Sequence, residues 1–332
     1  MRLETSYLGF RLPHPFMAGA SPLVDDLDTV RQLEDAGSAA IVMHSLYEEQ
    51  LTGEQLATSH HMEKGEESFA EARSYLPRPP RFALGPDEYL EQIRRIKERV
   101  AVPVIGSLNG VTMEGLLEYG RLIAQAGADA LELNLYYLSV DESHDGAWIE
   151  QRTVDTVRHL IAGVHIPVAV KLSPFYSSLL NLARQLDETG ARGLLLFNRF
   201  YQPDIDPENL EAIPALRLSD SSELLLRIRW LGILHGRVRA SLGVTGGVHT
   251  ALDAVKAVMA GAHAVQLVSA LLRNGPEHLN LVRAGFARWL EEHEYDSVEQ
   301  MRGNMSLFRC PDPAAYERTG YMTVLQSWQG FR

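Results

Sequence analysis

One short phrase recurs along the chain, in which a helical stretch ends at Gly-Ala or Gly-Ser and an apolar strand follows at once. Its copies are DAGSAAIVM (35–43), QAGADALEL (125–133), ETGARGLLL (188–196) and MAGAHAVQL (259–267). Each copy has the pattern of a helix stopped by a glycine C-cap and joined directly to a buried parallel strand. Repeated joints of this kind constrain the chain to a regular array of alternating helices and strands.

Further apolar segments supply the strands between these joints, at residues 14–18, 102–108, 166–172 and 238–242. Helical patterns separate the strands, for example at 86–100, 113–126 and 178–188. Eight strands that alternate with helices favour a closed (β/α)8 TIM barrel of the α/β class over an open doubly wound sheet. We therefore predict one domain over residues 1–332, with an irregular C-terminal extension at 305–332.

Two long segments interrupt the alternation, residues 47–85 after the second strand and residues 199–236 after the sixth. Insertions after the strands of a barrel lie on its catalytic face, where long loops serve as lids or substrate walls. Surface decoration or a dimer contact is an equal alternative for each of them.

The composition excludes several classes of function. The chain has 332 residues and a net charge of −12, which argues against nucleic acid or an anionic membrane as its main partner. Its single cysteine, Cys310, cannot form an intrachain disulfide or an iron–sulfur cluster with cysteine ligands from this chain alone. No HxH or HExxH spacing is present, so we expect no catalytic metal. The first residues show no signal pattern and no run of about 20 apolar residues occurs, so we expect a cytoplasmic protein.

The stretch from Arg239 to Asn274 predicts a phosphate site. It has the pattern of strand, Gly-rich turn, helix, strand and a second helix, with the turn at 243–247. Phosphate sites in barrels are frequently built from the loops after strands seven and eight, where glycines let backbone N–H groups approach an anion. The residues expected to hold the phosphate are Thr245, Gly246, Gly247, Ser269 and Ala270.

Polar residues follow almost every predicted strand, and in a barrel such positions converge on one mouth. The most informative of these residues is Lys171, which lies near the end of the apolar strand VAVKL. A cation at that depth needs an anionic or electron-rich partner. A flavin ring suits it, because reduction leaves negative charge at N1 and O2; the alternative is an internal ion pair with a carboxylate such as Glu132.

Asparagines at the strand exits offer paired donors and acceptors for the amide edges of a planar heterocycle. Asn109, Asn134 and Asn198 occupy such positions, and Ser21, Ser45 and Ser107 are weaker candidates. Among the histidines that could titrate near neutrality, only His44 directly follows a strand. His144 and His249 have the pattern of ordinary polar loop residues.

Five motifs together resemble the dihydroorotate dehydrogenase family in order and spacing. They are HPFMAGAS (14–21), ELNL (132–135), VAVKLSPF (168–175), LFN (196–198) and GVTGGVHTALDAVKAVMAGAHAVQL (243–267). The resemblance implies a barrel that holds FMN, commonly as a homodimer, and oxidises a dihydropyrimidine, a planar cyclic amide. It also implies that Gly19, Ala20 and Ser21 line the flavin, that Lys171 faces its N1/O2 side, and that Asn134 and Asn198 border flavin and substrate.

The sequence departs from the family pattern around the expected substrate. Where the family has a cysteine or serine base, this chain has Tyr137, and Ser139 could replace it only if the loop is shifted by two residues. A phenol with an ordinary pKa near ~10 is a poor base at neutral pH. His44 stands where the family usually has lysine, and the asparagine-rich substrate loop has no match in 47–85. Flavin binding is therefore expected to be retained and substrate recognition altered.

Three functions remain open at this point. The first is an FMN oxidoreductase that passes electrons to a second substrate or a redox partner protein, with Lys171, Tyr137, Ser139 and His44 as catalytic candidates. The second is a cofactor-free lyase or isomerase in which Lys171 forms a Schiff base with a phosphorylated substrate. The third is a flavin-binding paralogue with another substrate or without activity.

Overall fold

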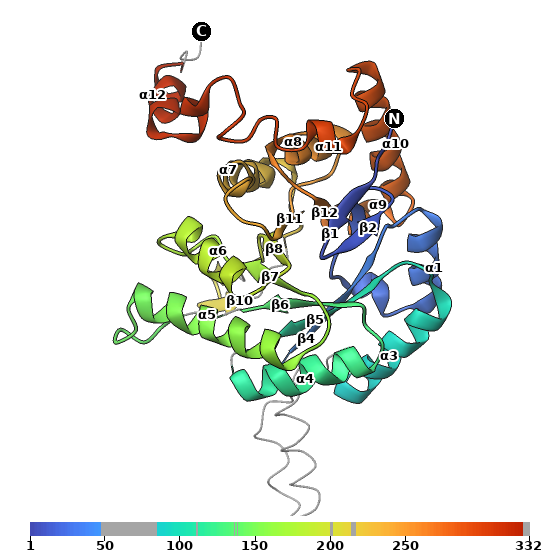
Figure 1. Ribbon diagram of the computed structural model, residues 1–332. Coiled ribbons are helices and arrows are strands. Elements are labelled where there is room, and N and C mark those ends of the chain that lie inside the picture. Colours follow the sequence, from blue (N-terminus) through green and yellow to red (C-terminus); the bar gives the residue numbers. More distant parts are fainter. Residues whose placement is uncertain are drawn as a thin grey trace, which may run out of the picture.

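The computed structural model describes residues 1–47, 85–110, 112–135, 137, 139–199, 202–213 and 217–327. Its centre is a closed barrel of parallel strands (Figure 1). In chain order these are β3 (Phe16–Ala18), β4 (Ile41–Tyr47), β5 (Val104–Asn109), β6 (Ala130–Asn134), β7 (Val168–Leu172), β8 (Gly193–Leu196), β11 (Ser241–Thr245) and β12 (Ala264–Leu267). The last strand pairs with the first, so the predicted TIM barrel is confirmed.

Helices surround the barrel and cover the outward side chains of its strands (Figure 1). The larger ones are α1 (Leu27–Asp35), α3 (Pro86–Arg99), α4 (Met113–Gln125), α5 (Gly146–Gly163), α6 (Leu179–Glu188), α7 (Leu224–Leu234), α8 (Ala251–Ala260) and α10 (His278–Glu292). Shorter pieces are η1 (Pro22–Val24), η3 (Ser221–Glu223), α9 (Ser269–Asn274), α11 (Val298–Met301), η4 (Pro313–Tyr316) and α12 (Arg318–Gln326). No helix in the described ranges combines the length and apolar character needed to cross a membrane.

The glycines of the repeated phrase end their helices as predicted. Gly37, Gly127, Gly190 and Gly261 all have positive φ, a conformation in which a side chain would be strained. The chain can therefore turn from each helix directly into the next strand.

The seventh strand lies further along the chain than the pattern 238–242 predicts. It covers Ser241–Thr245, so Gly243 belongs to the strand and the turn begins at Gly246. The carboxylate of Asp187 accepts the backbone N–H groups of Arg239 and Ala240, which holds these residues in the preceding loop. A side-chain acceptor on another element therefore decides where this strand begins, and the strand's own apolar pattern does not reveal it.

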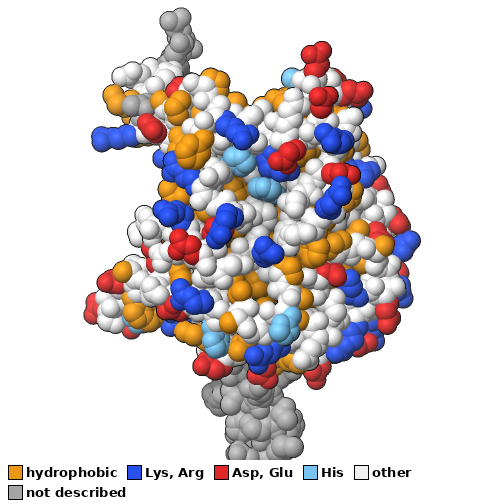
Figure 2. Space-filling view, viewed as in Figure 1, with side chains coloured by type: hydrophobic (Ala, Val, Ile, Leu, Met, Phe, Trp, Pro, Cys, Tyr) orange, Lys and Arg blue, Asp and Glu red, His pale blue; other side chains and the backbone are white. Residues whose placement is uncertain are grey.

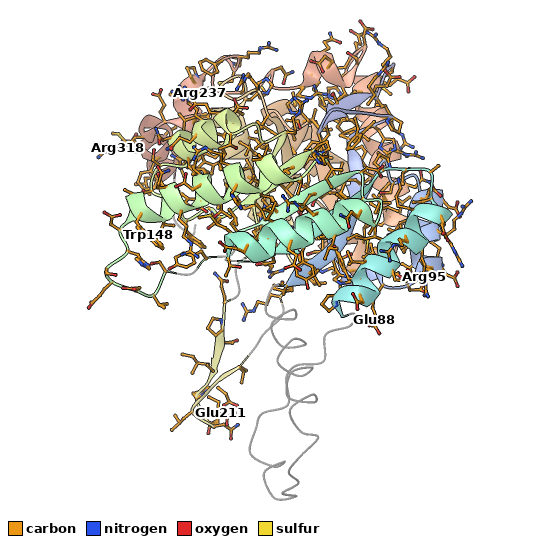
Figure 3. All side chains as sticks on the ribbon, turned by 60° about the horizontal axis from the view of Figure 1, so that its bottom comes forward. Glu88, Arg95, Trp148, Glu211, Arg237 and Arg318 are labelled. Carbon is orange, nitrogen blue, oxygen red and sulfur yellow. The ribbon has the colours of Figure 1, made fainter. Side chains whose placement is uncertain are left out.

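Of the two long segments predicted at 47–85 and 199–236, the structure describes mainly the second. Residues 48–84 of the first lie outside the described residues. The second contains a small hairpin of β9 (Asp204–Asp206) and β10 (Glu211–Ile213), then α7. Figure 3 shows this hairpin, with Glu211 labelled, projecting away from the barrel. The end of the segment is thus a regular barrel helix.

An N-terminal hairpin closes the end of the barrel at which the parallel strands begin. This is called the lower end, whatever the orientation of the figures, and the end with the strand C-termini is called the upper end or mouth. The hairpin consists of β1 (Thr5–Tyr7) and β2 (Phe10–Leu12). Tyr7 and Leu8 are buried in a cluster with small and aliphatic residues from inside the barrel, among them Ala130, Ala169 and Ala264. The lower end is therefore filled, and the opposite end carries the polar residues.

Candidate active site

A buried ion pair lies inside the barrel. Lys171, on β7, places its Nζ 3.0 Å from Oε1 of Glu132 on β6. Gln266, on β12, donates its Nε2 to the other carboxylate oxygen of Glu132 at 2.7 Å. Glu132 is 1% exposed and Lys171 8% exposed, so the ammonium and the amide replace the water that this carboxylate would otherwise hold. The internal ion pair considered for Lys171 is present, and it leaves the other two protons of the ammonium for further contacts.

A second polar group surrounds Asn134, which lies two residues beyond Glu132 at the end of β6. Asn134 donates its Nδ2 to Ser107 Oγ at 3.0 Å and to Ser45 Oγ at 3.2 Å. The two hydroxyl oxygens lie 2.9 Å apart. Asn134 is the register partner of both Asn109 on β5 and Lys171 on β7. The strand-exit residues predicted from the sequence thus converge at adjacent positions.

Tyr89 supports this group from α3. Its hydroxyl donates to the backbone oxygen of Ser107 and accepts the backbone N–H of the same residue, both at 2.9 Å. Burial raises the pKa of the Tyr89 phenol above its ordinary value, and the nearby Glu132 and Asp25 charges add to the rise. Tyr89 is therefore a neutral structural support for Ser107.

The predicted phosphate residues form a second cluster beside the mouth. The backbone N–H of Gly247 donates to Ser219 Oγ at 3.3 Å, and Ser219 N–H donates to Ser269 Oγ at 3.1 Å. His249 Nε2 lies 3.3 Å from the same Ser219 oxygen. Burial and the charge of Arg273 lower the pKa of His249. Two hydroxyls, an imidazole nitrogen and a backbone N–H thus meet in one place.

The protein's own packing requires glycine at these turns. Gly246 and Gly247 both have φ +79°, and a Cβ on Gly247 would lie 2.5 Å from the backbone nitrogen of Leu224. A Cβ on Gly246 would lie 2.7 Å from Nη2 of Arg227, whose Nε donates to the Thr245 carbonyl at 2.6 Å. The start of α7 therefore packs tightly against this turn.

The remaining predicted cofactor residues lie at the strand exits or just beyond them. A Cβ on Gly19 would come within 2.6 Å of Val268, so the chain after β3 passes close to the end of β12. Ser21 is buried directly before η1, and Ala270 is buried at the start of α9. The backbone N–H of Asn198 donates to the Leu172 carbonyl at 2.7 Å. Ala20 is partly buried.

His44 lies behind Ser45. The pairing of β4 with β5 is irregular between Val42 and Ser45, and His44 packs edge-on against the Tyr89 ring. Its Nδ1 lies 2.5 Å from Asp25 Oδ1, within ion-pair distance, although the angles between the two groups do not fit a hydrogen bond. His44 thus faces α3 and the segment after η1.

Tyr137 lies with residues at the start of α5. Its hydroxyl lies 3.1 Å from His144 Nδ1, and the Arg152 guanidinium is 4.9 Å from its ring centre. His144 stacks on Trp148 with ring centres 3.6 Å apart, and its Nε2 lies 3.8 Å from Asp141. These contacts place the Tyr137 ring beside the start of α5. Ser139 is partly buried in the same loop.

With this geometry described, comparison with known proteins identifies the family. The profile of the family described as dihydroorotate dehydrogenase matches residues 82–290, more than half of the chain. The chain belongs to this family. It is thus an oxidoreductase related to enzymes that act on CH–CH groups, and the predicted resemblance is confirmed.

Curated relatives of the dihydroorotate dehydrogenase family match nearly the whole chain. A protein of Thermoplasma acidophilum named "Dihydroorotate dehydrogenase B (NAD(+)), catalytic subunit" is 26% identical over 91% of this chain and 98% of its own length. Proteins with the same name from Methanocaldococcus jannaschii and Pyrococcus abyssi are 24% and 26% identical, each over 91% of this chain and 97% and 98% of their own lengths.

Sequence reasoning missed Gln266 and Ser219 of this candidate site, and it treated His249, which lies beside Ser219, as an ordinary polar loop residue. Gln266 is a polar residue inside the apolar strand AVQL, and that contrast could have revealed it. Ser219 lies in an irregular stretch whose pattern gives no signal, and only the fold brings it to Gly247. In the part of the chain that the structure describes, no three His, Cys, Asp or Glu side chains gather as metal ligands would.

Proposed function

We propose that this chain binds FMN at the barrel mouth and oxidises a small, reduced, cyclic amide resembling a dihydropyrimidine. One observation carries the proposal: Lys171 lies over the buried Glu132–Gln266 pair and beside Asn134, at adjoining strand exits. A fixed cation next to amide donors suits a planar ring that gains negative charge on reduction. Membership of the dihydroorotate dehydrogenase family supports the same reading.

The residues around the mouth fit FMN in their chemistry. The ring would be held by Gly19, Ala20, Ser21, Ser45, Asn109, Asn134, Lys171 and Asn198. The phosphate would be held by Thr245, Gly246, Gly247, Ser269 and Ala270. We add Ser219 and His249 to this set, because they lie within hydrogen-bond distance of one another and Ser219 contacts Gly247 and Ser269. Gln266 Oε1 is buried without a hydrogen-bond partner among the described residues, an acceptor of the kind that a buried ligand N–H would satisfy.

Bound FMN would supply the acceptor for a hydride. The chain's own residues would then have three tasks. Lys171 stabilises negative charge on the ring, while Glu132 holds the ammonium in place. Asn134, fixed by Ser45 and Ser107, orients the amide edge of the substrate. The remaining task is removal of a proton from the substrate carbon.

We assign the proton acceptor to Tyr137 acting with His144. Tyr137 alone is a poor base, but His144 can accept its proton through the hydrogen bond at 3.1 Å. Asp141, 3.8 Å from the other ring nitrogen, stabilises the imidazolium so formed. Ser139 and His44 are the alternative acceptors, and His44 has its own carboxylate partner in Asp25.

The setting of the reaction is also part of the proposal. We propose a cytoplasmic homodimer that transfers electrons to a separate acceptor, such as a redox partner protein. The relatives' names describe catalytic subunits, which supports a partner of this kind. The net charge of −12 argues against nucleic acid and anionic membranes as partners.

The visible absorption spectrum of the purified protein tests the proposal first. Flavin bands near ~370 and ~450 nm that bleach on anaerobic addition of dihydroorotate would support both cofactor and substrate class. Bands that bleach only with dihydrouracil would redirect the substrate assignment. Bands that persist with both would leave a flavin protein with another substrate or none. No bands after incubation with FMN would reject the proposal and favour a Lys171 lyase, testable by borohydride trapping.

A further inference from the structure

His249 lies in the loop between β11 and α8, among the residues assigned to the cofactor phosphate. Its Nε2 lies 3.3 Å from Ser219 Oγ, and the same hydroxyl oxygen accepts the backbone N–H of Gly247 at 3.3 Å. The backbone N–H of Ser219 donates to Ser269 Oγ at 3.1 Å, which brings the start of α9 into the same group. These four residues are called the phosphate cluster below, and the imidazole is part of it.

The main chain of His249 is held by two helices. Asp253 of α8 accepts the His249 N–H at 3.1 Å, together with the N–H of Thr250 at 3.0 Å and the hydroxyl of Ser221 at 2.7 Å. His278, at the start of α10, donates its Nε2 to the His249 carbonyl at 2.8 Å. The backbone groups of His249 are thus bonded to α8 and α10, while its ring is directed to the phosphate cluster.

The charge of the whole molecule does not attract an anion. The net charge is −12, and Figure 2 shows basic and acidic side chains interspersed over the face in view. A phosphate monoester carries a charge of about −1.5 to −2 at neutral pH. Positive charge that stabilises it must therefore come from groups beside the phosphate cluster.

The charged and titratable groups that face the His249 ring come from four parts of the fold. They are Arg273 of α9, His278 of α10, Asp253 of α8 and Asp220 directly before η3. Burial and the charge of Arg273 lower the pKa of His249, and the two carboxylates act in the opposite direction. Because an ordinary histidine has a pKa near ~6.5, a lowered value leaves this ring neutral at pH 7. His249 can therefore gain a positive charge where the phosphate is expected.

We propose that His249 takes up a proton when a phosphate monoester binds at the phosphate cluster, so that retention of the phosphorylated cofactor weakens as pH rises above neutrality. The inference rests on the proposed function, because it concerns the phosphate site of that cofactor. The proton comes from water and leaves both ring nitrogens protonated, so Nε2 becomes a donor. An anion within about 4–6 Å favours the charged ring and raises its pKa by about 1–3. Binding then consumes a proton, and a lower proton concentration opposes it.

Fluorescence titration of the flavin-free full chain with FMN and with riboflavin tests the proposal between about pH 6.5 and pH 9. Riboflavin has the same ring without the phosphate, so it is the ligand control. The dissociation constant of FMN should rise about fivefold or more over this range, and that of riboflavin should change much less. His249→Gln keeps a polar side chain that does not titrate, and it should remove the pH dependence of FMN binding. His159→Gln, at an exposed position of α5, is the matched control and should behave as the wild type.

Nuclear magnetic resonance of the chain with isotope-labelled histidine measures the ring itself. His249→Gln assigns the His249 signal, and circular dichroism checks that this variant is folded. The pKa of His249 is then measured with inorganic phosphate and with chloride at equal ionic strength. Phosphate should raise this pKa by about 1 or more.

The outcomes separate this inference from the proposed function. If neither flavin binds, the proposed function fails, and the phosphate titration of His249 still decides whether the ring takes up a proton. If FMN binds but the pH dependence survives in His249→Gln, the inference is overturned and flavin binding stands. A pKa of His249 that phosphate leaves unchanged would overturn it as well.

Discussion

The two ends of the barrel interior differ in the side chains that fill them, which are mainly apolar at the lower end and polar at the upper end. At the lower end, the Tyr7 and Leu8 side chains of the N-terminal hairpin fill the space between small residues such as Gly193 and Ala264. At the upper end, Glu132, Lys171 and Asn134 form buried polar contacts beneath the mouth. Residues that mainly stabilise the fold therefore lie at one end of the barrel, and the candidate catalytic residues lie at the other. This division is general in TIM barrels. Substitutions at the two ends should therefore have different signatures.

The largest effect is expected at the upper end. Lys171→Met removes the cation facing Glu132 and should destabilise the fold by about 3–5 kcal/mol, because a buried carboxylate loses its charged partner. Turnover should fall at least about 100-fold. Thermal unfolding and flavin reduction kinetics measure the two losses separately.

The double variant Lys171→Met with Glu132→Gln separates the structural role from the chemical one. It removes both charges, so most of the stability should return, while turnover should remain low. If the double variant recovered turnover as well, the assigned role of Lys171 in the reaction would be wrong.

The effect of low pH on folding stability is expected to arise mainly at the lower end, through two buried histidines. Burial, reinforced by the charge of Arg302, lowers the pKa of His263 to about 3. Burial, with the charge of Arg283, lowers that of His14 to about 4. Between an unfolded pKa near ~6.5 and these values, the unfolded chain binds protons that the native chain does not, so stability is lost as pH falls through this window.

Denaturant titrations from pH 7 to pH 4 measure this dependence. Over this pH range each histidine should contribute up to about 3 kcal/mol to the loss. His263→Asn should flatten the dependence, because it removes the buried imidazole. If the unfolding free energy of His263→Asn fell with pH as steeply as that of the wild type, His263 would not cause the acid sensitivity.

A smaller, purely structural effect is expected for Gly193→Ala. The added Cβ would lie 2.5 Å from Leu8 Cδ2, and overpacking of this kind costs about 1–3 kcal/mol. Flavin content and turnover of the folded fraction should not change. Leu8→Ala in the same chain makes room for the new methyl group, so the two changes should be less than additive in chemical denaturation.

The smallest effect is expected for Tyr7→Phe. The Tyr7 hydroxyl is buried without a hydrogen-bond partner among the described residues. Burial, with the charge of Glu132 added, raises the pKa of this phenol, so it stays neutral. Removing the hydroxyl should leave stability unchanged or raise it by up to about 1 kcal/mol. A clear loss of stability in calorimetry would instead indicate a partner for this oxygen.

Most of the fold was predictable because it depends on local signals. Glycine caps such as Gly127 and Gly261 mark the ends of helices, and an apolar strand follows each. The start of β11 was not predictable, because a carboxylate from Asp187 far along the chain holds the preceding residues. Likewise, the position of the N-terminal hairpin was not predictable, because it depends on contacts between residues more than 200 positions apart.

The clustering of candidate residues was predictable where a polar residue ends an apolar strand, as with Lys171 and Asn134. The sequence does not reveal the direction in which a loop side chain points. Tyr137 lies three residues after the end of β6, yet its ring lies beside His144 and Arg152 at the start of α5. His44 faces Asp25 because β4 is irregular at that point, and no local pattern marks such an irregularity.

The N-terminal hairpin has a consequence for how the chain is made. Its partners come late: Leu8 bonds to Ser241, Thr5 to His263 and Arg302, and Arg2 pairs with the backbone beside Ser297. During synthesis the residues of the hairpin therefore leave the ribosome well before their partners at 241–302. Until the residues from 241 onward have emerged, Tyr7 and Leu8 lack part of the barrel wall that buries them, so the nascent chain exposes apolar side chains that a chaperone could bind.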